Sequence, residues 1–339
     1  LKYVRIEFAG IALEPNKEIN GITFGSVGRG TQVDFIQVSF SGDDSYEWFG
    51  GTVDCKHLIA YRGIDDDFDT DFGYRGRIQF GLIIRDNTMY DAAGDSNGLE
   101  SDNDATGSAN TPQTSVVFSN LTIIGAKGNG SLSLPAGEKF EKAFRIRRNS
   151  SISVFNSLVV GWEKGLSIEG ASCEANVTAG TLVFSNNVLT ELPLGASYVT
   201  ATPTFFTTVA SVNDTTTSVS QINWINAFPT LGTTPDCRLD STSLVATGAD
   251  FTNSKFVGGF VSVNEIAKTT NVSIYPNPAT NNVNITTDRL VQVTLIDGMG
   301  RVINTQTVSG NLSLDVSTLT NGIYFLQVDN TTKKIIVRK

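Results

Sequence analysis

The chain has 339 residues, 40% of them hydrophobic, and a formal net charge of −9 at pH 7. This hydrophobic content excludes a disordered chain, and no apolar run reaches the roughly 18 residues that a membrane-spanning helix needs. The acidic charge argues against nucleic acid or an anionic membrane as a partner, but it permits cations and neutral glycans.

Leu1 opens inside a predicted strand, and the first residues do not have the pattern of a signal peptide. Because a solenoid needs a cap at each end, we expect further coils and a signal peptide upstream of residue 1.

Residues 1–192 repeat one phrase, in which two short apolar strands meet at an Asn or Ser corner and end at a glycine. Clear copies lie at 116–125, 153–161 and 181–189, and looser ones at 3–10, 33–42, 53–63 and 77–86. One such unit cannot bury its apolar side chains alone, so the repeat predicts a solenoid of stacked coils. Asn suits the left-handed backbone of a sharp corner, and stacked Asn side chains can hydrogen-bond to each other. An antiparallel β-sandwich is the alternative.

These corners and stacked apolar positions resemble the right-handed parallel β-helix of pectin-lyase-like proteins. The run from residue 1 to about residue 187 more closely resembles secreted β-helix proteins of the Bacteroidetes. The segments that carry this resemblance are 1–10, 41–45, 47–52 and 65–72. The resemblance implies an all-β parallel β-helix and a secreted protein, in a family without a settled activity.

An alternating acidic run is the strongest candidate site. If the segment is extended, Asp65, Asp67, Asp69 and Asp71 project from one face about 7 Å apart, while Phe68 and Phe72 point into the core. So many like charges require a counter-charge, and hard oxygen ligands of this kind suit Ca²⁺. The four aspartates are therefore the predicted metal ligands.

Several alternatives to calcium remain open: solvated or arginine-paired acids, a glycan-binding groove without catalysis, or an enzyme. The available cations are Arg75 and Arg77 nearby and, two coils further on, Arg145 and Arg147 in the columns of Asp69 and Asp71. Further acids lie one coil earlier and in the following loop, at Asp43, Asp44, Glu47, Glu100, Asp102 and Asp104.

The arrangement is similar to that of polysaccharide lyases of this fold, which use calcium and an Arg or Lys base, whereas the hydrolases use paired aspartates. The candidate catalytic residues are accordingly Asp69, Asp71, Arg145 and Arg147. The Gly-His-Gly element of the hydrolases is absent. The single histidine, His57, is interpreted as a packed or surface residue of a strand, so no catalytic triad or zinc site is predicted.

Two longer loops are predicted at 87–112 and 126–142, and loops on one side of a solenoid commonly form its binding face. Cys55 falls in an apolar strand, whereas Cys173 and Cys237 fall in loops. In an oxidising compartment these two could form a disulfide.

Beyond residue 192 the repeat decays, and residues 193–263 are predicted to cap the helix with irregular strands, followed by a linker at 264–271. Asp214-Thr215-Thr216 and Asp240-Ser241-Thr242 resemble the Asp-(Ser/Thr)-X acceptor motif for O-glycans in these bacteria.

Residues 272–339 predict a separate small Ig-like β-sandwich, because short alternating strands are separated by turn signals at Asp297-Gly298 and Asn321-Gly322. The predicted strands are 283–286, 291–296, 302–308, 312–316, 322–328 and 334–337.

Motifs in this segment resemble the type A C-terminal sorting domain of the type IX secretion system. The resemblance implies export through the periplasm and across the outer membrane to the cell surface or the medium, with the translocon, an outer-membrane shuttle barrel and a sortase-like protease as partners. The residues that carry the sorting signal are Tyr275, Pro276, Asn277, Pro278, Gly322, Tyr324, Lys333, Lys334, Val337 and Lys339.

Overall fold

The computed structural model describes residues 1–11, 19–92, 94–128, 132–190, 198–199, 212–226, 235–240, 242–256, 272–298, 300–328 and 331–339. It divides into two compact units, residues 1–260 and residues 261–339. The linker predicted at 264–271 lies outside the described residues.

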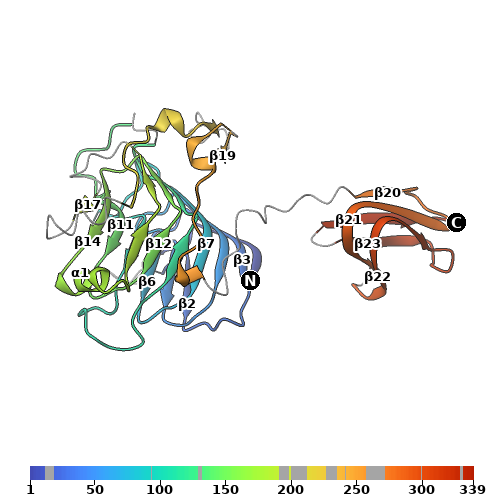
Figure 1. Cartoon of the computed structure of the whole chain (residues 1–339), viewed down its shortest axis with the longest axis horizontal. Helices are drawn as coiled ribbons and strands as arrows, with labels where there is room; N and C mark the ends of the chain where they lie inside the picture. Colours follow the sequence, from blue (N-terminus) through green and yellow to red (C-terminus); the bar gives the residue numbers. More distant parts are fainter. Residues whose placement is uncertain are drawn as a thin grey trace. The chain divides into compact units, whose positions relative to one another are not determined.

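The first unit is a parallel β-helix, as predicted, with two parallel sheets that run along its axis (Figure 1). One sheet contains β1 (Lys2–Glu7), β3 (Val33–Ser39), β5 (Cys55–Tyr61), β7 (Arg77–Ile84), β9 (Val117–Ser119), β10 (Thr122–Ile124), β12 (Ser153–Phe155), β13 (Leu158–Val160), β15 (Val183–Ser185) and β16 (Val188–Leu189). The other contains β2 (Ile22–Gly25), β4 (Tyr46–Phe49), β6 (Phe68–Asp71), β8 (Leu99–Ser101), β11 (Lys142–Ile146), β14 (Lys164–Ile168) and β17 (Tyr198–Val199). The parallel pairing of β17 with β14 continues past the predicted end at residue 192.

Each coil turns at one corner through a residue with a left-handed backbone. In register these residues form one column, Tyr3, Phe35, His57, Phe80, Asn120, Asn156 and Asn186. The conformation costs a bulky residue about 1 to 3 kcal/mol, whereas Asn adopts it readily. Stacked rings offset this cost in the first four coils, with centroids 4.3–5.0 Å apart. In the later coils the predicted Asn stacking is confirmed, since Asn186 Nδ2 donates to Asn156 Oδ1 at 2.6 Å.

The C-terminal part of the β-helix unit is irregular. It contains the antiparallel pair β18 (Trp224–Asn226) and β19 (Asp236–Leu239), and three short 3-10 turns, Val219–Gln221, Leu244–Ala246 and Ser254–Phe256. The helix α1 (Ala171–Thr178) lies earlier, between β14 and β15. Ile222 packs on Leu158 and Val160, so this segment covers the last coils, as predicted for the described part of 193–263. The range 87–112 is not one loop, because it contains β8.

The second unit is an antiparallel sheet in the order β20-β21-β23-β24, with β22 paired to β21. Its strands are β20 (Ser273–Tyr275), β21 (Asn282–Ile296), β22 (Val302–Asp315), β23 (Gly322–Val328) and β24 (Thr331–Val337). Four of the predicted strands merge into two, because β21 and β22 continue through a register shift between Thr287 and Val291.

Candidate functional site

The outward face of β4, β6, β8 and β11 carries the charged side chains of the predicted site. Strand register aligns Glu47, Asp69, Glu100 and Arg145 in one column, which confirms the predicted column shared by Asp69 and Arg145. Successive residues of a strand point to opposite faces. The preceding residue in each strand is accordingly fully buried in the core: Tyr46, Phe68, Leu99 and Phe144.

Five carboxylates gather at one end of this face. Oxygens of Asp44, Glu47 and Asp69 lie within 4.8 Å of one another, and oxygens of Asp43, Asp44 and Asp65 form a second group of the same size. Asp44 belongs to both groups. We call these five residues the acidic cluster.

Asp44 and Glu47 of the acidic cluster accept hydrogen bonds from neutral groups. The backbone N–H of Asp66 donates to Asp44 Oδ1 at 2.9 Å, and the side-chain amide of Asn20 donates to Glu47. Asp69 Oδ1 is buried and has no hydrogen-bond partner. In the part of the chain that the structure describes, no Lys or Arg forms an ion pair with Asp44, Glu47 or Asp69.

Burial and mutual repulsion raise the pKa of four carboxyls of the acidic cluster, those of Asp44, Glu47, Asp65 and Asp69. Burial, followed by the charges of Asp43 and Asp71, raises the pKa of Glu47 to about 8. Burial and Asp66 likewise raise the pKa of Asp65 to about 8. The pKa values of Asp44 and Asp69 rise too, with burial as the largest cause. Without a bound cation, part of the acidic cluster is therefore protonated at neutral pH.

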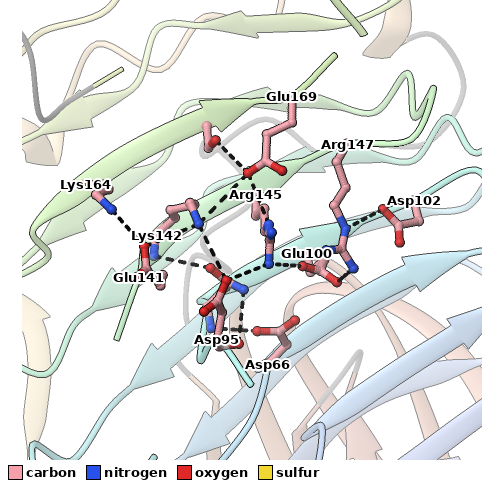
Figure 2. A network of polar contacts seen from close by, with 12 residues as sticks. Asp66, Asp95, Glu100, Asp102, Glu141, Lys142, Arg145, Arg147, Lys164 and Glu169 are labelled. Atoms are coloured by element: carbon pink, nitrogen blue, oxygen red, sulfur yellow. Dashed lines mark hydrogen bonds and ion pairs between the residues drawn. The ribbon is translucent and has the colours of Figure 1, made fainter. Parts of the chain in front are cut away.

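Toward β11 and β14 the same face is neutralised within the chain (Figure 2). Arg145 contacts Asp95 at 3.0 Å, Glu169 at 3.1 Å and Glu100 at 3.3 Å. Lys164 lies 2.8 Å from Glu141, and Lys142 lies 3.4 Å from it. We call this set the paired network: Asp95, Glu141, Lys142, Arg145, Lys164 and Glu169.

Arg147 and Arg145 act as counter-charges here. Arg147 bridges Glu100 and Asp102, and Arg148 lies 2.6 Å from Asp102. Burial lowers the pKa of Arg145 and Arg147, but Glu100 and the neighbouring acids outweigh it and raise the pKa above the ordinary value. Both guanidiniums therefore stay protonated, and neither can accept a proton as a general base near neutral pH.

The prediction that Asp65, Asp67, Asp69 and Asp71 share one face is wrong. β6 begins only at Phe68, so alternation does not extend back to Asp67. Asp67 lies inside the coil in a fully buried ion pair with Arg85, at 2.7 Å. Asp71 lies outside both groups of close carboxylates and accepts from its neighbouring backbone N–H.

Two neighbours of the run also differ from expectation. Phe72 is 58% exposed, because it occupies a left-handed corner and turns away from the core. Arg77, expected near the acids, pairs with Asp54 at 2.6 Å, and the carbonyl of Arg75 accepts from Arg29. The acidic cluster thus receives no counter-charge from this pair of arginines.

Sequence reasoning missed a groove of about 450 Å³ on the other sheet. It follows the corner column along Tyr3, Phe35, His57 and Phe80, and its second wall includes Gln37. His57 is a packed residue, as expected, with Phe35 and Phe80 on its two faces and Asp34 at 2.8 Å. The groove could have been found from the repeat, because the first coils have an aromatic residue or His at the corner position where later coils have Asn.

The sorting-signal residues come together although they are distant in sequence. The Asn277 side chain donates to the carbonyl of Lys334 and accepts from the N–H of Ile336, so the Tyr275–Pro278 segment lies beside β24. Tyr324 and Val337 are buried in the core of the unit, and the Tyr324 hydroxyl contacts Thr320. Lys333, Lys334 and Lys339 are exposed.

The predicted disulfide is wrong, because Cys55, Cys173 and Cys237 are all free. Cys173 lies in α1, which the sequence did not predict, and its side chain packs into the β-helix core. Cys237 lies on β19, in the segment that covers the last coils.

The predicted glycosylation sequences form local turns. Asp214 accepts from the backbone and hydroxyl of Thr216, and Asp240 accepts from the same groups of Thr242. The acceptor position of the first sequence, Thr215, is half-buried, and that of the second, Ser241, lies outside the described residues.

Comparison with known families assigns both units. Residues 1–229 match the pectate-lyase-like β-helix domain, and residues 273–339 match the secretion system C-terminal sorting domain. No curated protein and no solved structure gave a match. Among the described helices, none has the length and hydropathy of a membrane span. The chain therefore belongs to the pectate-lyase-like β-helix family and carries a type IX sorting domain, which directs it through the translocon to the cell surface or the medium.

Proposed function

We propose that this protein is a calcium-binding β-helix that the type IX secretion system exports. The observation that carries the proposal is Asp69 Oδ1, a buried carboxylate oxygen without a partner, within 4.8 Å of Asp44 and Glu47. An all-oxygen set of this charge fits Ca²⁺. Asp44, Glu47 and Asp69 would hold the ion, with Asp43 and Asp65 beside it. The ion would supply the positive charge that Asp44, Glu47 and Asp69 do not receive from any described Lys or Arg.

The test is thermal unfolding of the full chain in EDTA and in millimolar calcium chloride. A ligand that binds only the folded state stabilises it by mass action, so calcium should raise the melting temperature. Asp69→Asn should abolish this rise, whereas Glu141→Gln, a matched change in the paired network, should preserve it. Equal melting curves for the unmodified protein in EDTA and calcium would refute the site.

Polysaccharide binding on the same face is a second candidate. It is favoured by Phe72, an exposed ring 5.6 Å from Phe49 and next to Asp71. Aromatic rings and a bridging cation together suit a uronate-rich glycan. Affinity electrophoresis in acidic polysaccharides should show retardation that Phe72→Ala and EDTA each reduce. Ultraviolet absorbance of unsaturated products would distinguish a lyase from a protein that only binds.

For export, we propose delivery to an outer-membrane shuttle barrel and removal of the sorting domain by a sortase-like protease. The sequence motifs of residues 272–339 support this proposal. Deleting residues 272–339 should trap the protein in the cell envelope. Fractionation of the host, with mass analysis of the exported form, measures both trapping and processing.

A further inference from the structure

Strands β23 and β24 carry apolar side chains on both faces, although an antiparallel sheet at a surface normally alternates. On the inner face Tyr324, Leu326 and Ile335 enter the core of the unit. On the outer face Ile323, Phe325 and Ile336 alternate with them. This sequence pattern is typical of strands covered on both sides.

Register extends the outer apolar face across the sheet. Ile323 pairs with Ile336, Phe325 pairs with Ile296, and Ile296 pairs with Val302. Val302 is 64% exposed and Ile323 is 51% exposed. We call this set the outer apolar patch: Ile296, Val302, Ile323, Phe325 and Ile336. Ile296, Phe325 and Ile336 are half-buried. A contiguous apolar surface of this kind commonly marks an interaction site.

Cations border the outer apolar patch. Lys334 pairs with Phe325 in register, and Arg338 directly follows the end of β24. Both side chains are exposed. Arg301, beside Val302, has a 75% exposed side chain and pairs with Asp297 at 2.7 Å. Among the described residues, the unpaired charge of the border therefore comes from β24 and the residues after it. Residues 272–339 contain six Lys or Arg and four Asp, so this unit is slightly basic. Residues 1–271 contain 19 Lys or Arg and 30 Asp or Glu, so the rest of the chain is acidic. A partner of complementary charge would present acids around an apolar centre.

The contacts divide the sorting-signal residues into two kinds. Asn277, Tyr324 and Val337 build the unit, because they hydrogen-bond to β24 or fill the core. The Lys334 side chain is exposed and lies at the border of the outer apolar patch. Residues of the second kind are available to a partner.

We propose that the outer apolar patch, with its cationic border, is the surface through which the type IX export machinery binds this unit. The proposal rests on the sorting role that the family match assigns. The complementary surface is a protein face with an apolar centre and an acidic border.

The test uses the full chain expressed in a host with a type IX system. Ile323→Ser should lower the exported fraction about tenfold, as truncation of a central contact does. Lys334→Glu should lower it about threefold, because it reverses a charge at the border. The matched controls on the same two strands, Gln327→Ser and Thr332→Glu, should leave export near that of the unmodified protein. Melting curves of the purified variants verify that each one folds.

Three outcomes overturn the proposal in different ways. Normal export of folded Ile323→Ser and Lys334→Glu would show that the outer apolar patch is not the binding surface, but it would leave the sorting role intact. Normal export after deletion of residues 272–339 would show that this unit is not needed for sorting at all. If the unmodified protein is a dimer and Ile323→Ser is a monomer with normal export, the patch binds a second copy instead.

Discussion

The acidic cluster and the paired network are joined by one column of a sheet face, which contains Glu47 and Asp69 of the cluster and Arg145 of the network. The two sets nevertheless meet opposite electrostatic conditions. Asp69 has a buried oxygen without a partner, whereas Glu169, three coils away, accepts from Arg145 Nε at 3.1 Å and from Ser167 Oγ at 2.9 Å. The pKa of Asp69 is raised, chiefly by burial. At Glu169 burial raises the pKa, but the charge of Arg145 and the hydrogen bond from Ser167 outweigh burial and lower the pKa overall.

This difference shows that the fold itself does not set the charge of the face. Both regions use the same strand geometry and the same outward positions. What changes is the residue one coil further on, which is Glu100 above Asp69 and Arg145 above Glu100. Where acid follows acid in this column, the repulsion is relieved either by protonation of a carboxyl or by a cation from outside the chain.

Removal of the central cation of the paired network should have the largest effect. Arg145→Met leaves Asp95 and Glu169 without their guanidinium and should destabilise the protein by about 3 kcal/mol, because a partly buried ion pair is broken on one side. Chemical denaturation in EDTA measures the change. A loss within experimental error would show that solvent, and not Arg145, neutralises these acids.

The pH dependence of stability should reveal the acidic cluster. The pKa of Glu47 rises from 4.5 to about 8 on folding, so its contribution is fully present below pH 4.5 and is lost as pH rises toward 8. In EDTA the melting temperature should therefore fall between pH 5 and pH 8, by the equivalent of about 2 kcal/mol. Calcium should flatten the profile. A profile that rises over this range in EDTA would contradict the assignment.

Neutralising one acid in each region should change stability in opposite directions. In EDTA, Asp69→Asn should stabilise the protein by about 1 kcal/mol through relief of repulsion. Glu169→Gln should destabilise it by about 1 kcal/mol through loss of a charged hydrogen bond at a partly exposed site. Denaturation midpoints of the two variants give the signs directly, and equal signs would remove the distinction between the regions.

The smallest effect is expected at the border of the paired network. Lys164→Met removes a contact with Glu141 in which the lysine side chain is 41% exposed. Such pairs contribute about 0.5 kcal/mol or less. A larger loss in the same denaturation experiment would mean that the network acts cooperatively at its edge.

The sequence predicted the coils and the column shared by Asp69 and Arg145 because both depend on a repeat with a fixed register. It failed at Asp67 and Phe72, where the strand ends and a turn inverts the side-chain direction. The groups around Asp44 could not be derived, since they depend on how adjacent turns stack. The eight-residue helix α1 gave little signal, because so short a segment is helical mainly through its packing.

The left-handed corner residue fixes the strand register from one coil to the next. Corner residues are 22 positions apart from Phe35 to His57 but 40 positions apart from Phe80 to Asn120. In every coil, however, the next residue resumes the register, and Ile36, Leu58 and Leu121 are all buried there. A slip of one residue would force a left-handed backbone on such a side chain. The corner therefore restores the strand register once in every coil. Residues can be inserted on the opposite side of a coil without shifting the charged columns.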